Sequence, residues 1–82
     1  MTAWEAKRVA DEANHTNSDN IIQAMVADIT SIAKEGRYSV EYSYSTPINF
    51  NYQEVRKFFE SQGYKVITEV APGTLTILIR WD

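Results

Sequence analysis

The chain has 82 residues, of which 44% are hydrophobic and 23% charged, which excludes a second independent domain and a disordered or fibrous chain. Its net charge of −3 and its pI near 5.0 argue against a generic binder of the nucleic-acid backbone, because phosphates attract basic proteins. The absence of cysteine excludes disulfides, thiolate chemistry and cysteine-ligated zinc.

The hydropathy pattern contains no run near the ~18 apolar residues of a membrane span. The first five residues lack the basic and apolar regions of a signal peptide. We therefore expect a soluble protein without a membrane partner, located in the cytoplasm.

The N-terminal residues form the first predicted element. Thr2 and Glu5 have the spacing of a capping box, which predicts a short helix over residues 3–13. Its apolar stripe consists of small residues, namely Ala6, Val9, Ala10 and Ala13. Such a helix is marginal unless something packs on it, so residues 1–13 are a candidate interaction arm. Residues 14–20 are rich in Asn and other residues that favour turns and caps, which predicts a polar break in the chain.

A second, strongly amphipathic helix is predicted to follow the break. Apolar residues recur at three- and four-residue spacing from Ile21 to Ala33, and Gly36 stands where a left-handed C-cap is expected. Tyrosines and valine then alternate with polar residues over 38–45, the period-two pattern of a strand.

The C-terminal part predicts one more helix and two strands. Asn51 and Glu54 form a second capping box, so a helix is expected from Tyr52 to about Gln62. Strands are predicted over 64–70 and 75–81, joined by a hairpin loop.

These elements define an α+β fold in a single domain over residues 1–82. The order is α-α-β-α-β-β, with the helices packed on one face of a three-stranded antiparallel sheet. The predicted core comprises Val26, Ile29, Val40, Phe58, Ile77 and Ile79. The other sheet face would expose Ser39, Glu41, Ser43, either Thr68 or Ile67, Thr76, Leu78 and Arg80. A leucine on that face suggests a partner.

Candidate catalytic chemistry is sparse. His15 is the single histidine, and in a polar linker we interpret it as solvated rather than catalytic. The carboxylates fall on exposed helical positions, and neither a metal-ligand spacing nor a phosphate-binding glycine loop occurs. We therefore expect no enzyme activity, no cofactor and no metal.

Trp4 is the residue that most suggests binding. The stripe around it has too little apolar surface to bury an indole, so its partner is either its own domain, another subunit or a target protein. The predicted partner-binding residues are Trp4, Lys7, Arg8, Leu78 and Arg80. Because a chain of this size without disulfides buries a modest share of its surface, we also predict a homo-oligomer.

The tyrosines of the first strand leave a second interpretation open. Aromatic rings beside basic groups can stack and bind a small nucleotide, and the candidate residues are Tyr42, Tyr44, Lys65 and Arg80. Tyrosine is also a strong strand former, and core packing is the favoured interpretation.

Three segments resemble a loose group of small accessory proteins of tailed bacteriophages and prophages. They are Ala33–Val40, Gln62–Val66 and Leu78–Trp81, which match a helix stop followed by a strand, a Gly-Tyr entry into a strand, and a closing Ile-x-Trp strand. The resemblance implies an accessory or counter-defence protein that acts stoichiometrically on a host factor. It transfers no functional residue to this chain.

Three functional hypotheses follow. The first is a non-enzymatic, phage-encoded interaction protein that binds and inhibits or redirects a host protein in the cytoplasm of an infected or lysogenic bacterium. The second is an oligomeric sponge or sensor for a small nucleotide, and the third is a structural or assembly component of a virion. Long nucleic acid is not an expected partner, given the net charge.

Overall fold

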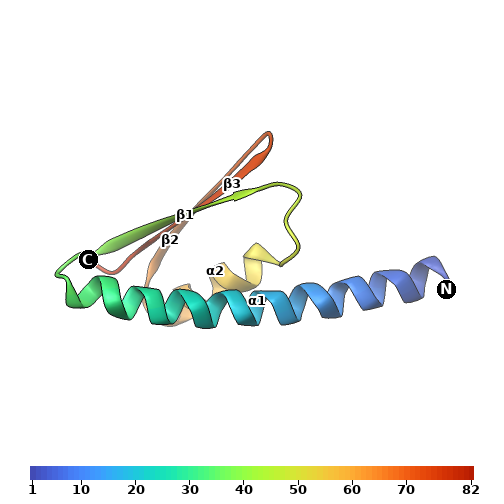
Figure 1. Cartoon of the computed structure of the whole chain (residues 1–82), viewed down its shortest axis with the longest axis horizontal. Helices are drawn as coiled ribbons and strands as arrows, with labels where there is room; N and C mark the ends of the chain where they lie inside the picture. Colours follow the sequence, from blue (N-terminus) through green and yellow to red (C-terminus); the bar gives the residue numbers. More distant parts are fainter.

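Two helices and three strands follow one another along the chain, and the computed structural model describes all 82 residues. The elements are α1 (Ala3–Lys34), β1 (Ser39–Ser45), α2 (Tyr52–Ser61), β2 (Lys65–Ala71) and β3 (Thr74–Arg80). Both helices lie on the same side of the sheet (Figure 1). The α+β class and the antiparallel sheet are thus confirmed, with one helix fewer than expected.

The predicted break over residues 14–20 is wrong, because α1 continues through it as one helix of 32 residues. The polar side chains of this stretch bind the segment before α2. Asn17 donates from Nδ2 to the carbonyl oxygen of Asn49 at 2.7 Å, and the Ser18 hydroxyl oxygen accepts the backbone amide of Asn51 at 2.8 Å. These tertiary hydrogen bonds outweigh the low helix propensity of the residues, so the helix is not interrupted.

Both ends of α1 are capped as the sequence predicts. The Thr2 hydroxyl accepts the amide of Glu5 at 3.1 Å. At the other end Gly36 adopts a φ of +84°, and the amide of Arg37 donates to the carbonyl of Ile32. This is a Schellman-type stop, in which glycine takes the left-handed conformation without the cost a side chain would add.

The sheet has β3 at its centre, paired antiparallel with β1 on one side and β2 on the other. The register aligns Val40, Ile79 and Val66 across the three strands, on the face toward the helices. It also places Ile67, rather than Thr68, beside Leu78 on the opposite face. We call that opposite side the open sheet face.

The core lies between the sheet and the two helices. Its nine buried residues are Met25, Ile29, Phe50, Val55, Phe59, Val66, Leu75, Ile77 and Ile79. The prediction is confirmed for Ile29, Ile77 and Ile79, and Val40 is half-buried against them.

Two of the predicted core residues are misplaced. Val26 is 42% exposed, because Met25 occupies the inward position on α1 and the next residue is turned by about 100°. On α2 the inward position belongs to Phe59, which is completely buried. Phe58, the preceding residue, is turned away by the same angle and lies half-buried at the edge of the core.

The first part of α1 extends beyond the rest of the molecule. Figure 1 shows the N-terminal turns of the helix projecting past the sheet and α2, and every side chain of residues 3–13 except the half-buried Glu5 is exposed. The molecule measures 50 × 25 × 18 Å, and a helix of this length spans ~48 Å. We call residues 3–13 the arm and the remainder of the domain the body.

Although α1 has the length to cross a bilayer, no helix of the structure combines that length with sufficient apolar character.

Candidate functional site

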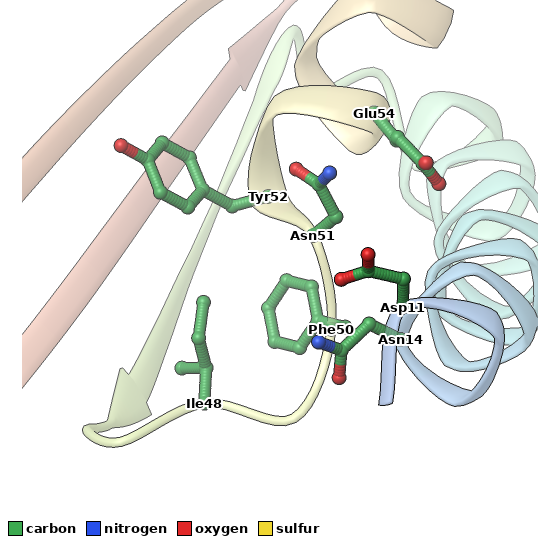
Figure 2. Close-up of a pocket in the computed structure, with 7 residues that line it drawn as sticks. All are labelled: Asp11, Asn14, Ile48, Phe50, Asn51, Tyr52 and Glu54. Atoms are coloured by element: carbon green, nitrogen blue, oxygen red, sulfur yellow. The ribbon is translucent and has the colours of Figure 1, made fainter. Parts of the chain in front are cut away.

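A cleft lies in the corner between α1, where it leaves the body, and the segment that leads into α2. Seven residues line it: Asp11, Asn14, Ile48, Phe50, Asn51, Tyr52 and Glu54. Figure 2 shows Asp11 and Asn14 projecting from α1 toward the segment that carries Phe50 and Asn51. Its volume of about 530 Å³ lies within the range of small-molecule and side-chain pockets.

The corner is held by the polar residues that sequence analysis assigned to a break. Ser18 is fully buried, and its hydroxyl bridges the carbonyl of Asn14 and the amide of Asn51. Asn51 in turn caps α2, because its side-chain oxygen accepts the amide of Gln53 at 3.0 Å. The start of α2 is thereby fixed against α1, which keeps the cleft open at a defined angle.

An ion pair closes one edge of this corner. His15 Nδ1 lies 3.0 Å from Oε2 of Glu54 on α2, and its Nε2 lies 3.5 Å from Oδ2 of Asp19. The hydrogen bond with Glu54, followed by the negative charge of Asp19, raises the pKa of His15 above its ordinary value of 6.5. When it is protonated, the imidazole ties α1 to α2 through an ion pair, a structural contact that the solvated interpretation of His15 had missed.

The arm carries three of the five predicted partner-binding residues. Trp4 is 71% exposed, and the guanidinium of Arg8 stacks over its ring at 5.5 Å. Lys7 donates to Asp11 at 2.7 Å, whereas Arg8 forms no ion pair anywhere in the chain. A shallow hollow lined by these four residues adjoins the cleft through Asp11, which belongs to both.

The other two predicted partner-binding residues lie on the open sheet face, away from the arm. Leu78 is half-buried beside Ile67, and Arg80 is bound by Asp82, whose carboxylate it contacts at 2.7 Å. That hydrogen bond lowers the pKa of Asp82. The structure therefore places the five residues on two separate surfaces.

The candidate nucleotide-binding residues are likewise divided. Tyr42 and Tyr44 lie on the helix-facing side of β1, where the Tyr42 hydroxyl donates to Asp28 at 2.6 Å and Tyr44 packs edge-on against Phe50. Burial, followed by the bond to Asp28, raises the pKa of Tyr42. Lys65 and Arg80 are paired in register on the open sheet face. A single chain thus does not bring the tyrosines and the basic residues into one site.

The cleft was not predicted from the sequence, although two of its lining residues, Asn51 and Glu54, were correctly placed at the start of α2. Ile48 and Phe50 stand in a short loop that follows Pro47, and nothing in their spacing indicates that they face Asp11 and Asn14 on a distant helix. The one available signal for the inward orientation of Asn14 was helical spacing. Asn14, Ser18 and Ile22 follow one another at four-residue intervals and therefore share the helix face that packs on the body.

No group of three or more His, Asp or Glu side chains is arranged to hold a metal ion. Comparisons with protein-family models, curated proteins and solved structures found no match to this chain.

Proposed function

We propose that this protein is a non-enzymatic interaction protein that binds another protein chain through its arm. The observation that supports the proposal most strongly is the arm's geometry: eleven helical residues extend past the body and carry an exposed tryptophan that forms its one cation–π contact with Arg8. Tryptophan and arginine are the residues most enriched in the energetically dominant parts of interfaces.

The surroundings of Trp4 support the same function. Lys7, Arg8 and Asp11 border it with both signs of charge, as in the polar rim around an interface anchor. The cleft at the base of the arm adds an apolar wall from Ile48 and Tyr52, both half-buried. The hollow at Trp4 and the cleft share Asp11, so the arm and the cleft adjoin as a surface that a protein segment can occupy.

The finer part of the proposal concerns the target. The sequence resemblance to phage accessory proteins supports a bacterial host protein, which this chain would inhibit or redirect by stoichiometric binding in the cytoplasm. The acidic net charge, and the placement of the candidate nucleotide-binding tyrosines and basic residues on opposite faces of the sheet, support protein rather than nucleic acid as the ligand.

The experiment is quantitative affinity capture from a bacterial lysate with three immobilised chains: the natural sequence, Trp4→Ala, and Tyr38→Ala as the matched control. Tyr38 is also a highly exposed aromatic, at 64%, but it lies just before β1, far along the chain from the arm. We expect one protein at near-equimolar amount on the natural chain and on Tyr38→Ala, and at least ~tenfold less on Trp4→Ala. Capture that is equal on all three chains would refute a role for the arm.

A further inference from the structure

One exposed stripe of α1 runs from the tip of the arm to the body. It consists of Trp4, Arg8, Asp11 and His15, which share one helix face because successive steps of four, three and four residues approximate whole turns. Two of its residues are paired with side chains outside the stripe, Asp11 with Lys7 and His15 with Glu54. All four residues are exposed. Their spacing reads the same in both directions along the helix.

A palindromic stripe is matched by its own copy when two helices lie antiparallel. With a two-fold axis between residues 9 and 10, Arg8 faces Asp11 of the partner subunit and Trp4 faces His15 of the partner subunit. The axis produces each contact twice, as an isologous interface requires. The stripe is thus complementary in charge to itself, and it pairs Arg8 with a carboxylate that this residue lacks within its own chain.

The length of free helix fits this pairing. Asn17 is the first residue of α1 whose side chain bonds the backbone of the segment before α2, at the carbonyl oxygen of Asn49. The same two-fold axis pairs residue 3 of one chain with residue 16 of the other, so the overlap ends just before this bond. It covers fourteen residues of each chain, ~21 Å of helix.

The cleft receives the remaining contact. In the antiparallel arrangement Trp4 lies beside His15 of the partner subunit, which directly follows Asn14 and stands about one turn from Asp11, two residues that line the partner's cleft. Helical side chains lean toward the N-terminus of their own helix, which directs the indole toward the partner's body. Its burial adds apolar area to a pair of helices that would alone fall short of the ~1,200 Å² of a stable interface.

We propose that the arm pairs antiparallel with the arm of a second copy of this chain, forming a two-fold dimer in which Arg8 binds Asp11 of the partner subunit and Trp4 occupies the partner's cleft. This inference rests on the proposed use of the arm in protein binding and names a second copy as the chain it binds.

The test is a charge exchange between two variants. Arg8→Asp places acidic residues at both positions 8 and 11, and Asp11→Arg places basic residues at both, so each variant repels its own copy. Mixed together, the two variants restore both attractive pairs. Sedimentation velocity gives the dimer dissociation constant, and Lys57→Glu, a charge reversal on the exposed part of α2, is the control.

We expect each single variant to dimerise about tenfold or more weakly than the natural chain, and the equimolar mixture to recover a heterodimer of near-natural affinity. Lys57→Glu should dimerise normally. A natural chain that is monomeric at micromolar concentration, or a mixture that remains monomeric, overturns the inference. A dimer unaffected by either variant also overturns it and assigns the interface to the open sheet face.

These failures are distinguishable from failure of the proposed function. If the chain is monomeric but Trp4-dependent capture of a bacterial protein persists, the arm binds a different protein and only the dimer is refuted. If the chain is monomeric and capture does not depend on Trp4, both are refuted.

Discussion

Ser18 shows how one polar residue can decide a local structure. Its hydroxyl is completely buried and is the only side-chain group that bonds the backbone amide of Asn51. Ser18→Ala leaves that amide without its partner, so we expect the free energy of unfolding to fall by about 1–3 kcal/mol despite the better helix propensity of alanine. Urea denaturation followed by circular dichroism measures the change.

The control for this prediction is Thr30→Ala. The Thr30 hydroxyl donates to the carbonyl of Val26, four residues earlier on the exposed side of the same helix, and holds no other element. Its removal should change the unfolding free energy by less than about 0.5 kcal/mol. Equal losses in the two variants would show that Ser18 does not fix the corner between α1 and α2.

The adjacent phenylalanines of α2 offer a second test at this scale. Phe59 is fully buried, and Phe59→Ala should cost about 3–5 kcal/mol, enough to unfold so small a domain. Phe58 is half-buried at the edge of the core, so Phe58→Ala should cost about half as much. Thermal unfolding of the two variants gives the order, and a larger loss for Phe58 would mean that α2 presents a different face to the sheet.

The third test at this scale concerns His15 and pH. Because its pKa is raised in the folded state by Glu54 and Asp19, the protonated imidazole stabilises the fold. This contribution is complete below the unfolded pKa of about 6.5 and is lost as the pH rises through the higher folded value. We therefore expect the melting temperature of the natural chain to fall, relative to that of His15→Gln, as the pH is raised from about 6 to 8.5.

The control for the pH series is Glu54→Gln, which removes the principal cause of the raised pKa while leaving the imidazole in place. Its melting temperature should show a weaker dependence on pH over the same interval. A difference between the natural chain and His15→Gln that does not vary with pH would refute the linkage.

At the scale of the elements, α1 should be a helix of uneven stability. Its middle is fixed to the body by Asn17 and Ser18, whereas the arm has no contact with the rest of a single chain beyond the lining of the cleft. We expect amide hydrogen exchange of the monomer to be slow from Ser18 to Ile32 and fast in the arm. Fast exchange confined to residues 14–20 would instead support the break that the composition suggested.

The sequence predicted most of the other elements because their signals are local. A helix cap depends on neighbours within a few residues, and so does the alternation of apolar residues in β1. The predicted caps are at Thr2, Asn51 and Gly36. The strand-to-strand register was not predicted, but the burial of Ile77 and Ile79 on one face followed from the period of two, and the structure confirms it.

The errors occurred where a partner distant in sequence decides the outcome. The Asn-rich segment is helical because Asn17 and Ser18 bind residues more than thirty positions away, which no local pattern reveals. The cleft was missed for the same reason. The lack of apolar neighbours on the helix around Trp4 was recognised because it is a local property, whereas the sequence left docking onto its own domain open, which the 71% exposure of Trp4 excludes within one chain.

At the scale of the whole molecule, the long helix α1 sets the length, and the sheet and α2 pack against its C-terminal two thirds to form the body (Figure 1). All nine core residues follow Ser18, so the body does not need the arm for its packing. The division of the chain into a packed body and a projecting arm explains why a protein with a well-packed core nevertheless exposes a tryptophan. It also separates the requirements of folding from those of binding.

The measurement that tests this division most directly is sedimentation equilibrium of the natural chain and of a variant lacking residues 2–13. Urea denaturation of both chains shows in parallel whether each is folded. The account predicts that the natural chain has twice the 9.4 kDa chain mass at micromolar concentration, and that the shortened chain is a monomer that still unfolds cooperatively. A shortened chain that retains the dimer mass would contradict the account, and so would a natural chain that is monomeric and loses no binding when the arm is removed.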